Sequence, residues 1–233
     1  ISEVDVGEII VITPIESIHR KLIEYFGAKE WEKWIYPPGE KWSIHRRTLN
    51  GVGVSFMRIG VGAGEAGVLE EVLVLGVKQV VFAGIGGGLG VEIGDIVVPY
   101  GAICEDGLSQ HYIPLGIPVE ASRRLVEAMV NASRSRGLKV HVGRVWTTTA
   151  PYREHFWKAE EYYSRWECRA VEMEVAAVYA LSTYYNVSSV ALLVISDLIY
   201  PHHEFGFHSK VYENSLKQVP AIIGEYLKRV LST

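Results

Sequence analysis

Residues 170–182, "AVEMEVAAVYALS", form an apolar stretch that carries two acids, Glu172 and Glu174, with Met173 between them. The pattern predicts a helix that is entered from a short strand. Acids in the first turn of a helix stabilise its positive end, which gives both glutamates a structural explanation. That explanation does not account for the apolar neighbours. The two carboxylates are therefore candidate ligand-binding groups at the edge of a core.

Strand-like and helix-like segments alternate on both sides of this stretch. Further strands are expected at 8–14, 78–87, 93–103, 139–149 and 189–199, a hairpin at 42–62, and helices at 15–27, 64–76, 120–137 and 214–232. This order predicts one three-layer α/β domain over residues 1–233, with a largely buried, mixed sheet. Ligands of such sheets bind where strands end and loops begin.

Composition excludes several classes of protein. The chain has 233 residues and a net charge of −4, with no dense basic run, which argues against nucleic acid as a partner. No uninterrupted apolar run approaches the roughly 20 residues that span a bilayer, and the first residues do not have the layout of a signal peptide. Cys104 and Cys168 form neither a disulfide framework nor a metal-ligand spacing. We therefore expect a reducing, cytoplasmic location.

The glycine-rich segment "AGIGGGLG" (83–90) contains a G-x-G-x-x-G spacing. In a dinucleotide-binding fold a helix opens at the third glycine, whereas here a turn and a strand follow. Glycines at a sheet end let two backbones approach closely, and their N–H groups can face a sugar or an anion. We therefore predict a ligand-facing turn at Gly86 and Gly87 that does not serve NAD.

A third acid, Asp197, ends the apolar run "ALLVISD" (191–197). A carboxylate at the exit of a buried strand either caps the following turn or serves as a poised acid. The three acids suit the cleavage of an N-glycosidic bond. An ionised carboxylate can accept hydrogen bonds from both hydroxyls of a ribose, while a protonated acid near the base can neutralise the leaving group. Burial near another carboxylate would raise the pKa of Asp197 toward that use.

The segments "VEMEVAA" (171–177), "VISD" (194–197), "GIGGGLGVEIGDIVVP" (84–99) and "EDGLSQHY" (105–112) together resemble the nucleoside phosphorylase family. That family includes purine nucleoside phosphorylases, uridine phosphorylases, and methylthioadenosine and adenosylhomocysteine nucleosidases. The resemblance runs along most of the chain. It implies a central mixed, partly barrel-like β-sheet flanked by helices, and a homo-oligomer (hexamer, trimer or dimer) that binds a small nucleoside.

The resemblance also implies roles for individual residues. Asp197 would protonate a purine at N7, and Glu174 would bind the ribose 2′- and 3′-hydroxyls. The other matched positions are Met173 in the sugar pocket, Glu172 at the base side, Tyr152 near base and sugar, and Gly86 and Gly87 under the nucleoside. The segment "DGLSQHY" is most similar to the uridine branch, but Asp197 bears directly on the leaving group and favours a purine.

The chain departs from the family at the phosphate site. Ile15 replaces a glycine, and Phe82 and Ile85 stand where an arginine and a hydroxyl residue are usual. Apolar side chains do not hold a dianion, so other cations must reach the site or phosphate is not the co-substrate. The candidates are Arg20, Arg46, Arg47 and Arg58, and Glu16 stands near the position of a nucleosidase general base.

Phosphorolysis to free base and ribose 1-phosphate is the favoured reaction, with inorganic phosphate as possible co-substrate and no other cofactor. Hydrolysis by water is the alternative, and a non-catalytic nucleoside-binding protein is the second alternative. The loop "YPHHEFGFHSK" (200–210) offers His202, His203, Glu204 and His208 as metal ligands. Adjacent histidines on a loop chelate one ion poorly, so we expect no metal and a loop that closes over the base.

Overall fold

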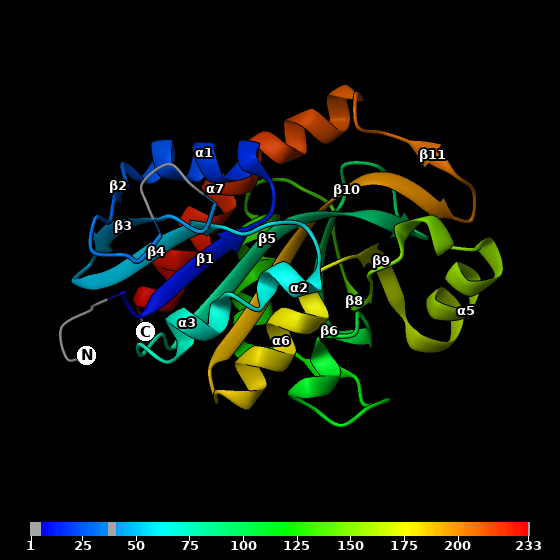
Figure 1. Ribbon diagram of the computed structural model, residues 1–233. Coiled ribbons are helices and arrows are strands. Elements are labelled where there is room, and N and C mark those ends of the chain that lie inside the picture. The colour runs from blue at the N-terminus through cyan, green and yellow to red at the C-terminus, as the bar shows by residue number, and fades with distance from the viewer. Residues whose placement is uncertain (1–5, 37–40, 233) are drawn as a thin grey trace.

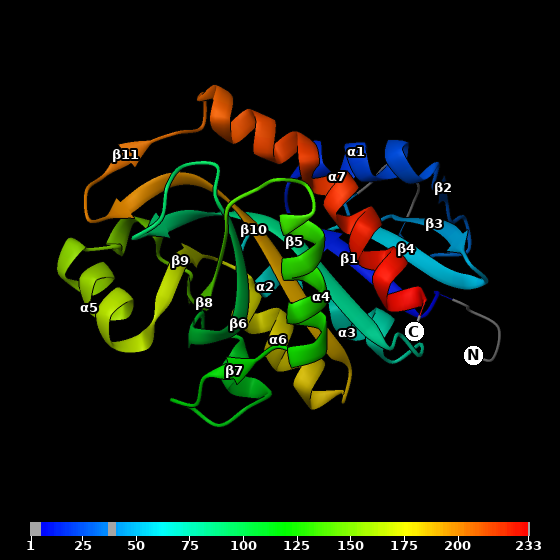
Figure 2. The same ribbon diagram turned by 180° about the vertical axis from the view of Figure 1, so that it is seen from behind.

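The computed structural model describes residues 6–36 and 41–232. Residues 1–5, 37–40 and 233 of the expected domain lie outside the described residues. A mixed β-sheet occupies the middle of the molecule, and helices cover both of its faces (Figures 1 and 2). The expected three-layer α/β fold is therefore confirmed.

Eleven strands of the described chain belong to one sheet. They are β1 (Ile9–Thr13), β2 (Lys29–Glu30), β3 (Ile44–Leu49), β4 (Val52–Arg58), β5 (Gln79–Leu89), β6 (Ile96–Glu105), β7 (Val119–Glu120), β8 (Val140–Thr148), β9 (Cys168–Glu172), β10 (Ser188–Tyr200) and β11 (Glu204–Phe205). Their order is β11-β10-β6-β8-β9-β5-β1-β4-β3-β2, with β7 beside β6 and a further pairing of β10 with β5. This last pairing closes β10, β6, β8, β9 and β5 into a ring, which is the expected barrel-like part.

The described chain has seven helices, six of which lie in two layers over the sheet. They are α1 (Glu16–Phe26), α2 (Ala63–Ala66), α3 (Leu69–Leu73), α4 (Arg123–Arg134), α5 (Phe156–Trp166), α6 (Val175–Tyr184) and α7 (Lys210–Leu231), with 3₁₀ turns η1 (Ser109–His111) and η2 (Pro151–Arg153). One apolar core lies between the sheet and α2, α3 and α6. A second lies between the sheet and α1, α4 and α7, on the side that Figure 2 shows, and a third, smaller one packs α5 against β5, β8, β9 and β10. The sheet is therefore buried on both faces, as its apolar strands require.

Helix α6, which follows the acidic stretch, is buried on all sides. Its residues from Val175 to Ser182 are all buried, and it contacts strands β6, β8 and β10 as well as α2 and α3. A helix without a polar face has to be packed all round. Glu172 and Glu174, which directly precede this helix, therefore lie in the interior of the molecule.

Local sequence signals explain some of the element ends. Gly27 closes α1 with a positive φ of 58°, a backbone conformation that glycine adopts without strain. Asn50 and Gly51 both have positive φ and join β3 to β4 in the expected hairpin. The helix expected at 64–76 is instead two short helices, α2 and α3. Helix α5 and the two-residue strands β2, β7 and β11 were not expected.

In the ranges 6–36 and 41–232, no helix is long and apolar enough to cross a membrane.

Candidate active site

The carboxyl end of β5, the bulge in β10 and the start of α6 surround a cavity of about 260 Å³. Six residues singled out from the sequence line it: Gly86, Gly87, Glu172, Met173, Glu174 and Asp197. The acids of the "VEMEV" and "VISD" segments therefore line one cavity. The rest of the wall includes Ile15, Val61, Ile85, Glu154 and Phe207.

Strand β9 ends at Glu172, beside the glycine-rich end of β5, and Glu174 follows two residues later at the start of α6. Strand β9 runs antiparallel to β5, with Val171 opposite Gly87, and parallel to β8. A side chain at Gly86 would place its Cβ 2.8 Å from the Val171 carbonyl oxygen, and one at Gly87 would lie 2.7 Å from Ile199 Cγ1. Gly86 and Gly87 lie inside strand β5, so the turn predicted there is wrong, but the two glycines do let β9 and β10 approach β5 closely.

Glu172 holds the start of α6 in place. Its carboxylate accepts hydrogen bonds from the backbone N–H groups of Glu174 and Val175, both at 2.7 Å, and from the Thr147 hydroxyl. Burial, followed by the charge of Glu174, raises the pKa of Glu172, and its three donors oppose the rise. Glu172 therefore serves as a cap for α6 as well as part of the cavity wall.

We expect Glu172→Ala to lower the free energy of unfolding by about 2–4 kcal/mol, because two buried N–H groups at the start of α6 lose their acceptor. Urea denaturation of the two proteins measures this difference. Glu160→Ala, at an exposed position of α5, is the matched control and should leave the unfolding midpoint unchanged. Equal stability of Glu172→Ala and the wild type would contradict the capping role.

Glu174 occupies the N-cap position of α6. Its Oε1 accepts a hydrogen bond of 2.5 Å from the backbone N–H of Gly62, in the loop before α2. Burial raises the pKa of Glu174, while the backbone N–H groups of Gly62 and Met173 lower it. The Glu174 side chain also lines the cavity, where it can meet a ligand.

Asp197 owes its direction to an irregularity in β10. Ala191, Leu193 and Ile195 belong to the core under α6, whereas Val190, Leu192 and Val194 belong to the opposite core. If side chains alternated strictly along β10, residue 197 would point into the core under α6. The register against β5 shifts between Ile195 and Asp197, so that Leu198 takes that place. The bulge thereby turns Asp197 into the cavity.

The surroundings of Asp197 suit a proton donor. Its Oδ1 accepts a hydrogen bond of 2.6 Å from the Ser196 hydroxyl. Burial raises the pKa of Asp197 above its usual value, while the Ser196 hydrogen bond and nearby His203 lower it. Asp197 therefore retains a proton more readily than an exposed aspartate does.

Sequence reasoning missed Glu154, which follows η2 and lines the same cavity. Burial, followed by the charge of Asp197, raises the pKa of Glu154 to about 7. No hydrophobic period or motif marks this position in the sequence. An acid inside a run of exposed aromatic and basic residues, "PYREHFW" (151–157), is the only signal there, and it is a weak one.

The structure corrects the expectation for Tyr152. Its side chain is 98% exposed and does not line the cavity, whereas its neighbours Pro151 and Glu154 do. In a 3₁₀ turn successive residues point about 120° apart, so the residue that faces the pocket cannot be inferred from an approximate match. Within this chain, Tyr152 contacts neither the base side nor the sugar side of the cavity.

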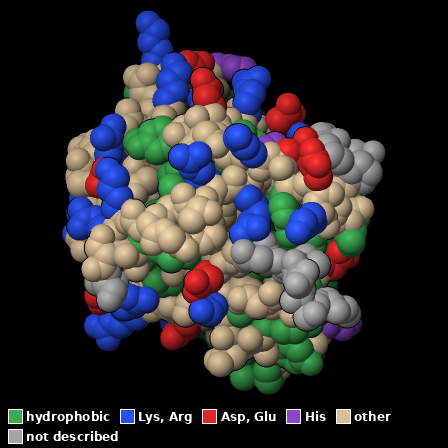
Figure 3. Space-filling model, turned by 90° about the vertical axis from the view of Figure 1, so that its left-hand side faces the viewer, with side chains coloured by type: hydrophobic (Ala, Val, Ile, Leu, Met, Phe, Trp, Pro, Cys, Tyr) green, Lys and Arg blue, Asp and Glu red, His purple; other side chains and the backbone are tan. Residues whose placement is uncertain are grey.

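The residues proposed for phosphate or for the nucleophile do not line the cavity either. Glu16 is exposed and pairs with Arg58 at 3.2 Å, and Arg20 and Arg47 are exposed. Arg46 is half-buried over the ring of Trp31. Strand β3, which carries Arg46 and Arg47, lies at the other end of the sheet from β9, where Lys and Arg side chains are spread over the surface (Figures 1 and 3). Their part in the site stays a prediction.

The lining of the cavity is apolar and acidic. Ile15, Val61 and Ile85 form its wall next to the first strand–helix turn, whereas Phe82 is fully buried in the core. Among the described residues that line the cavity, none is Lys, Arg or His. A group of three or more His, Cys, Asp or Glu side chains that could hold a metal ion is absent from residues 6–36 and 41–232.

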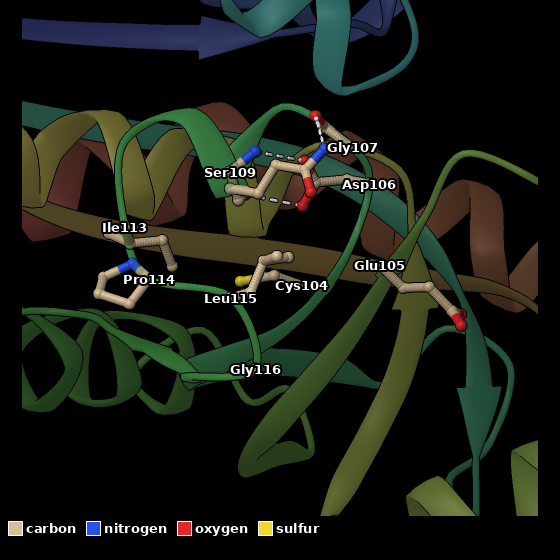
Figure 4. A pocket seen from close by; sticks show the side chains of 10 residues that line it. Cys104, Glu105, Asp106, Gly107, Ser109, Ile113, Pro114, Leu115 and Gly116 are labelled. Atoms are coloured by element: carbon tan, nitrogen blue, oxygen red, sulfur yellow. Dashed lines mark hydrogen bonds between the residues drawn. The ribbon is translucent and has the colours of Figure 1, made fainter.

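The "EDGLSQHY" segment forms a separate hollow of about 170 Å³ (Figure 4). Asp106 accepts hydrogen bonds from the backbone N–H groups of Leu108 and Ser109 and from the Ser109 hydroxyl, at 2.7–2.8 Å. These bonds stabilise the turn into η1. Residues 105–112 do not line the cavity that contains Asp197. The residues that are similar to the uridine branch therefore lie outside the cavity in which Asp197 would face the leaving group.

Comparison with known proteins places this geometry in a family. Residues 8–228 match the family model described as the phosphorylase superfamily. Over 155 residues the chain is 30% identical to a DeoD-type purine nucleoside phosphorylase of Streptococcus pneumoniae serotype 19F, covering 64% of this chain and 65% of that protein. The corresponding protein of Streptococcus thermophilus is 29% identical over 155 residues, 64% of this chain and 71% of its own length.

Two solved structures have the same fold. Purine nucleoside phosphorylase of Toxoplasma gondii, in complex with immucillin-H, superposes with a TM-score of 0.82 at 19% identity, covering 98% of this chain and 93% of its own. A futalosine hydrolase mutant of Helicobacter pylori superposes with a TM-score of 0.75 at 19% identity, covering 95% and 98%. The match to the family model over residues 8–228 and the acidic cavity at the end of β5 lead to one conclusion: the chain belongs to the phosphorylase superfamily.

Proposed function

We propose that the protein cleaves the N-glycosidic bond of a purine nucleoside. The observation that carries the proposal is the presence of Glu174 and Asp197 in one cavity, the former at a helix start and the latter at a strand bulge. In this proposal Glu174 accepts hydrogen bonds from the sugar hydroxyls, and Asp197 faces the base. Met173 lies between the two glutamates and would pack against the sugar.

The chemistry requires two charges to be stabilised. The bond between C1′ of the sugar and N9 of the purine breaks, and its electron pair leaves with the base. A proton from Asp197 moves to N7 and neutralises the leaving group, while nearby carboxylates stabilise the positive charge on the sugar. An oxygen nucleophile then bonds to C1′. With water as nucleophile, the proton that the water loses restores Asp197, so the cycle needs no other reactant.

The lining of the cavity favours water over phosphate. A phosphate dianion would meet the apolar side chains of Ile15, Val61 and Ile85 and a group of carboxylates, without a cation among the described lining residues. Desolvating a dianion there without compensation costs several kcal/mol or more. Hydrolysis is therefore the reaction that we propose first, ahead of the phosphorolysis that the sequence favours.

Phosphorolysis is the second candidate, because the Streptococcus relatives at 29–30% identity are phosphorylases. It requires cations from outside the cavity wall, and Arg46 or Arg47 of a neighbouring subunit would be their source.

We also propose a homo-oligomer, since large apolar side chains are exposed. Among these are Leu115, Ile117, Trp157, Trp166 and Phe205.

A product assay distinguishes the reactions. We expect the purified protein to convert adenosine or inosine to free base and ribose at a rate that inorganic phosphate does not change. The measurement is chromatography of the sugar product with and without 10 mM-scale phosphate. Ribose 1-phosphate formed only when phosphate is present would replace hydrolysis by phosphorolysis. Nucleoside binding without any product would reject both enzymatic proposals.

A further inference from the structure

Glu154 is a cavity residue to which the proposed reaction assigns no role. In the run 151–157 it is the one residue that is not exposed, since its neighbours Pro151, Tyr152, Arg153 and His155 all face solvent. It lines the cavity together with Asp197. Helix α5 begins two residues later, and Phe156 contacts the ring of Tyr200 at the end of β10, with centroids 5.3 Å apart. The segment is thus fixed against the strand that carries Asp197.

Among residues 6–36 and 41–232, no hydrogen-bonding partner of the Glu154 carboxylate is found. Within the described part of the chain it makes neither a hydrogen bond nor an ion pair, and the interaction that it has is electrostatic, with Asp197. Partly buried carboxylates are normally hydrogen-bonded, so one that faces an open cavity alone is available to a ligand. Glu172, a carboxylate with a structural role in this chain, differs from Glu154 in that it accepts three hydrogen bonds from protein donors.

Two neighbouring acids present a defined hydrogen-bond pattern. Burial and the charge of Asp197 raise the pKa of Glu154 to about 7, and burial also raises the pKa of Asp197, so the pair keeps a proton more readily than two exposed acids do. Whichever acid carries that proton, the pair offers one donor and one acceptor. A 6-aminopurine has the complementary edge, with an acceptor at N7 and a donor at the exocyclic amine. A 6-oxopurine has acceptors at both N7 and O6 and would leave one carboxylate without a partner.

We propose that Glu154 is a specificity-determining residue that accepts a hydrogen bond from the exocyclic amine of a 6-aminopurine nucleoside while Asp197 faces N7. This inference rests on the proposed cleavage of purine nucleosides and adds the class of base to it. Asp197 remains the acid of the reaction, and Glu154 selects which base presents its N7 to that acid.

The test compares adenosine with inosine, which differ at the 6-position. We expect the wild type to have a kcat/KM for adenosine at least about tenfold above that for inosine. The exocyclic amine of adenosine donates a hydrogen bond to the carboxylate, whereas O6 of inosine cannot donate and leaves that carboxylate unpaired. Glu154→Gln offers an amide donor to O6, so the ratio of the two kcat/KM values should fall by about tenfold or more. Glu160→Gln, with the same loss of charge on exposed α5, should leave the ratio unchanged.

The outcomes separate this inference from the proposed function. A wild type that prefers inosine, or a Glu154→Gln ratio equal to that of the wild type, overturns the role of Glu154 while cleavage itself stands. If the wild type cleaves neither nucleoside, the proposed function fails. Calorimetric titration with adenine and hypoxanthine then tests Glu154 alone. Tighter binding of adenine that Glu154→Gln abolishes supports the inference, and equal binding of the two bases rejects it.

Discussion

Asp197→Asn should lower kcat for a purine nucleoside by about 10²–10⁴-fold, the usual contribution of a general acid. The substituted amide has nearly the same shape and can still donate a hydrogen bond to N7, but it cannot transfer a proton to the departing base. The dissociation constant for the nucleoside should change by no more than about threefold, since the Ser196 hydroxyl can still donate to the retained oxygen at this position. Single-turnover kinetics and calorimetric titration measure the two quantities.

The same variant is expected to fold. Residue 197 lies in a strand bulge, and its pairing with Phe205 of β11 and Gly87 of β5 is made by the backbone. Circular dichroism and the unfolding midpoint should therefore match those of the wild type. A variant that turns over purine nucleosides within about twofold of the wild-type rate would remove Asp197 from the mechanism, since general-acid catalysis accounts for at least tens of fold.

Glu174→Ala should lower kcat/KM for ribosides by about 10²–10⁴-fold. A hydrogen bond to a charged acceptor contributes about 1.5–3 kcal/mol, and the proposal gives Glu174 two of them, to the 2′- and 3′-hydroxyls. The substrate 2′,3′-dideoxyadenosine, which has neither hydroxyl, should lose little further activity from the substitution. This difference identifies the sugar as the partner of Glu174. Free adenine should bind Glu174→Ala about as well as it binds the wild type.

An equal loss of activity with adenosine and with the dideoxy substrate would contradict this assignment. It would point instead to a structural effect through the backbone N–H of Gly62, whose hydrogen bond to Glu174 is also removed. Glu174→Gln is the matched control, because its amide oxygen can still accept from Gly62 while one acceptor for the sugar is lost. We expect it to fall between the wild type and Glu174→Ala.

Local signals were sufficient for much of this molecule. Gly27 and the pair Asn50–Gly51 mark a helix end and a hairpin turn because positive φ favours glycine and asparagine. The acids Glu174 and Asp197 could be placed in one pocket because each ends or begins an apolar element at the same edge of the sheet. The residues of the site that carry such signals were therefore found from the sequence.

Other features depend on contacts between distant segments. The pairing of β10 with β5 closes the barrel-like ring and joins residues more than a hundred positions apart, which no short window of sequence encodes. Helix α5 was missed although Ala159, Tyr162, Tyr163 and Trp166 have the i, i+3, i+4, i+7 spacing of one helix face, because the exposed Phe156 and Trp157 at its start obscure that pattern. Glu154 was missed and Tyr152 misplaced for a related reason: the 3₁₀ turn that orients them has no distinguishing pattern.

The bulge in β10 decides on which side of the strand Asp197 lies. Ser196 is the residue that the register skips, and it is fully enclosed there. If the strand kept all its residues and lost the bulge, strict alternation would turn Asp197 into the apolar layer beneath α6, and Leu198 would take its place at the pocket. Deleting Ser196 would instead place Asp197 directly after Ile195 and opposite Gly87, on its present side of the strand. In this strand the loss of the irregularity, rather than the loss of a residue, is the change that would disarm the acid.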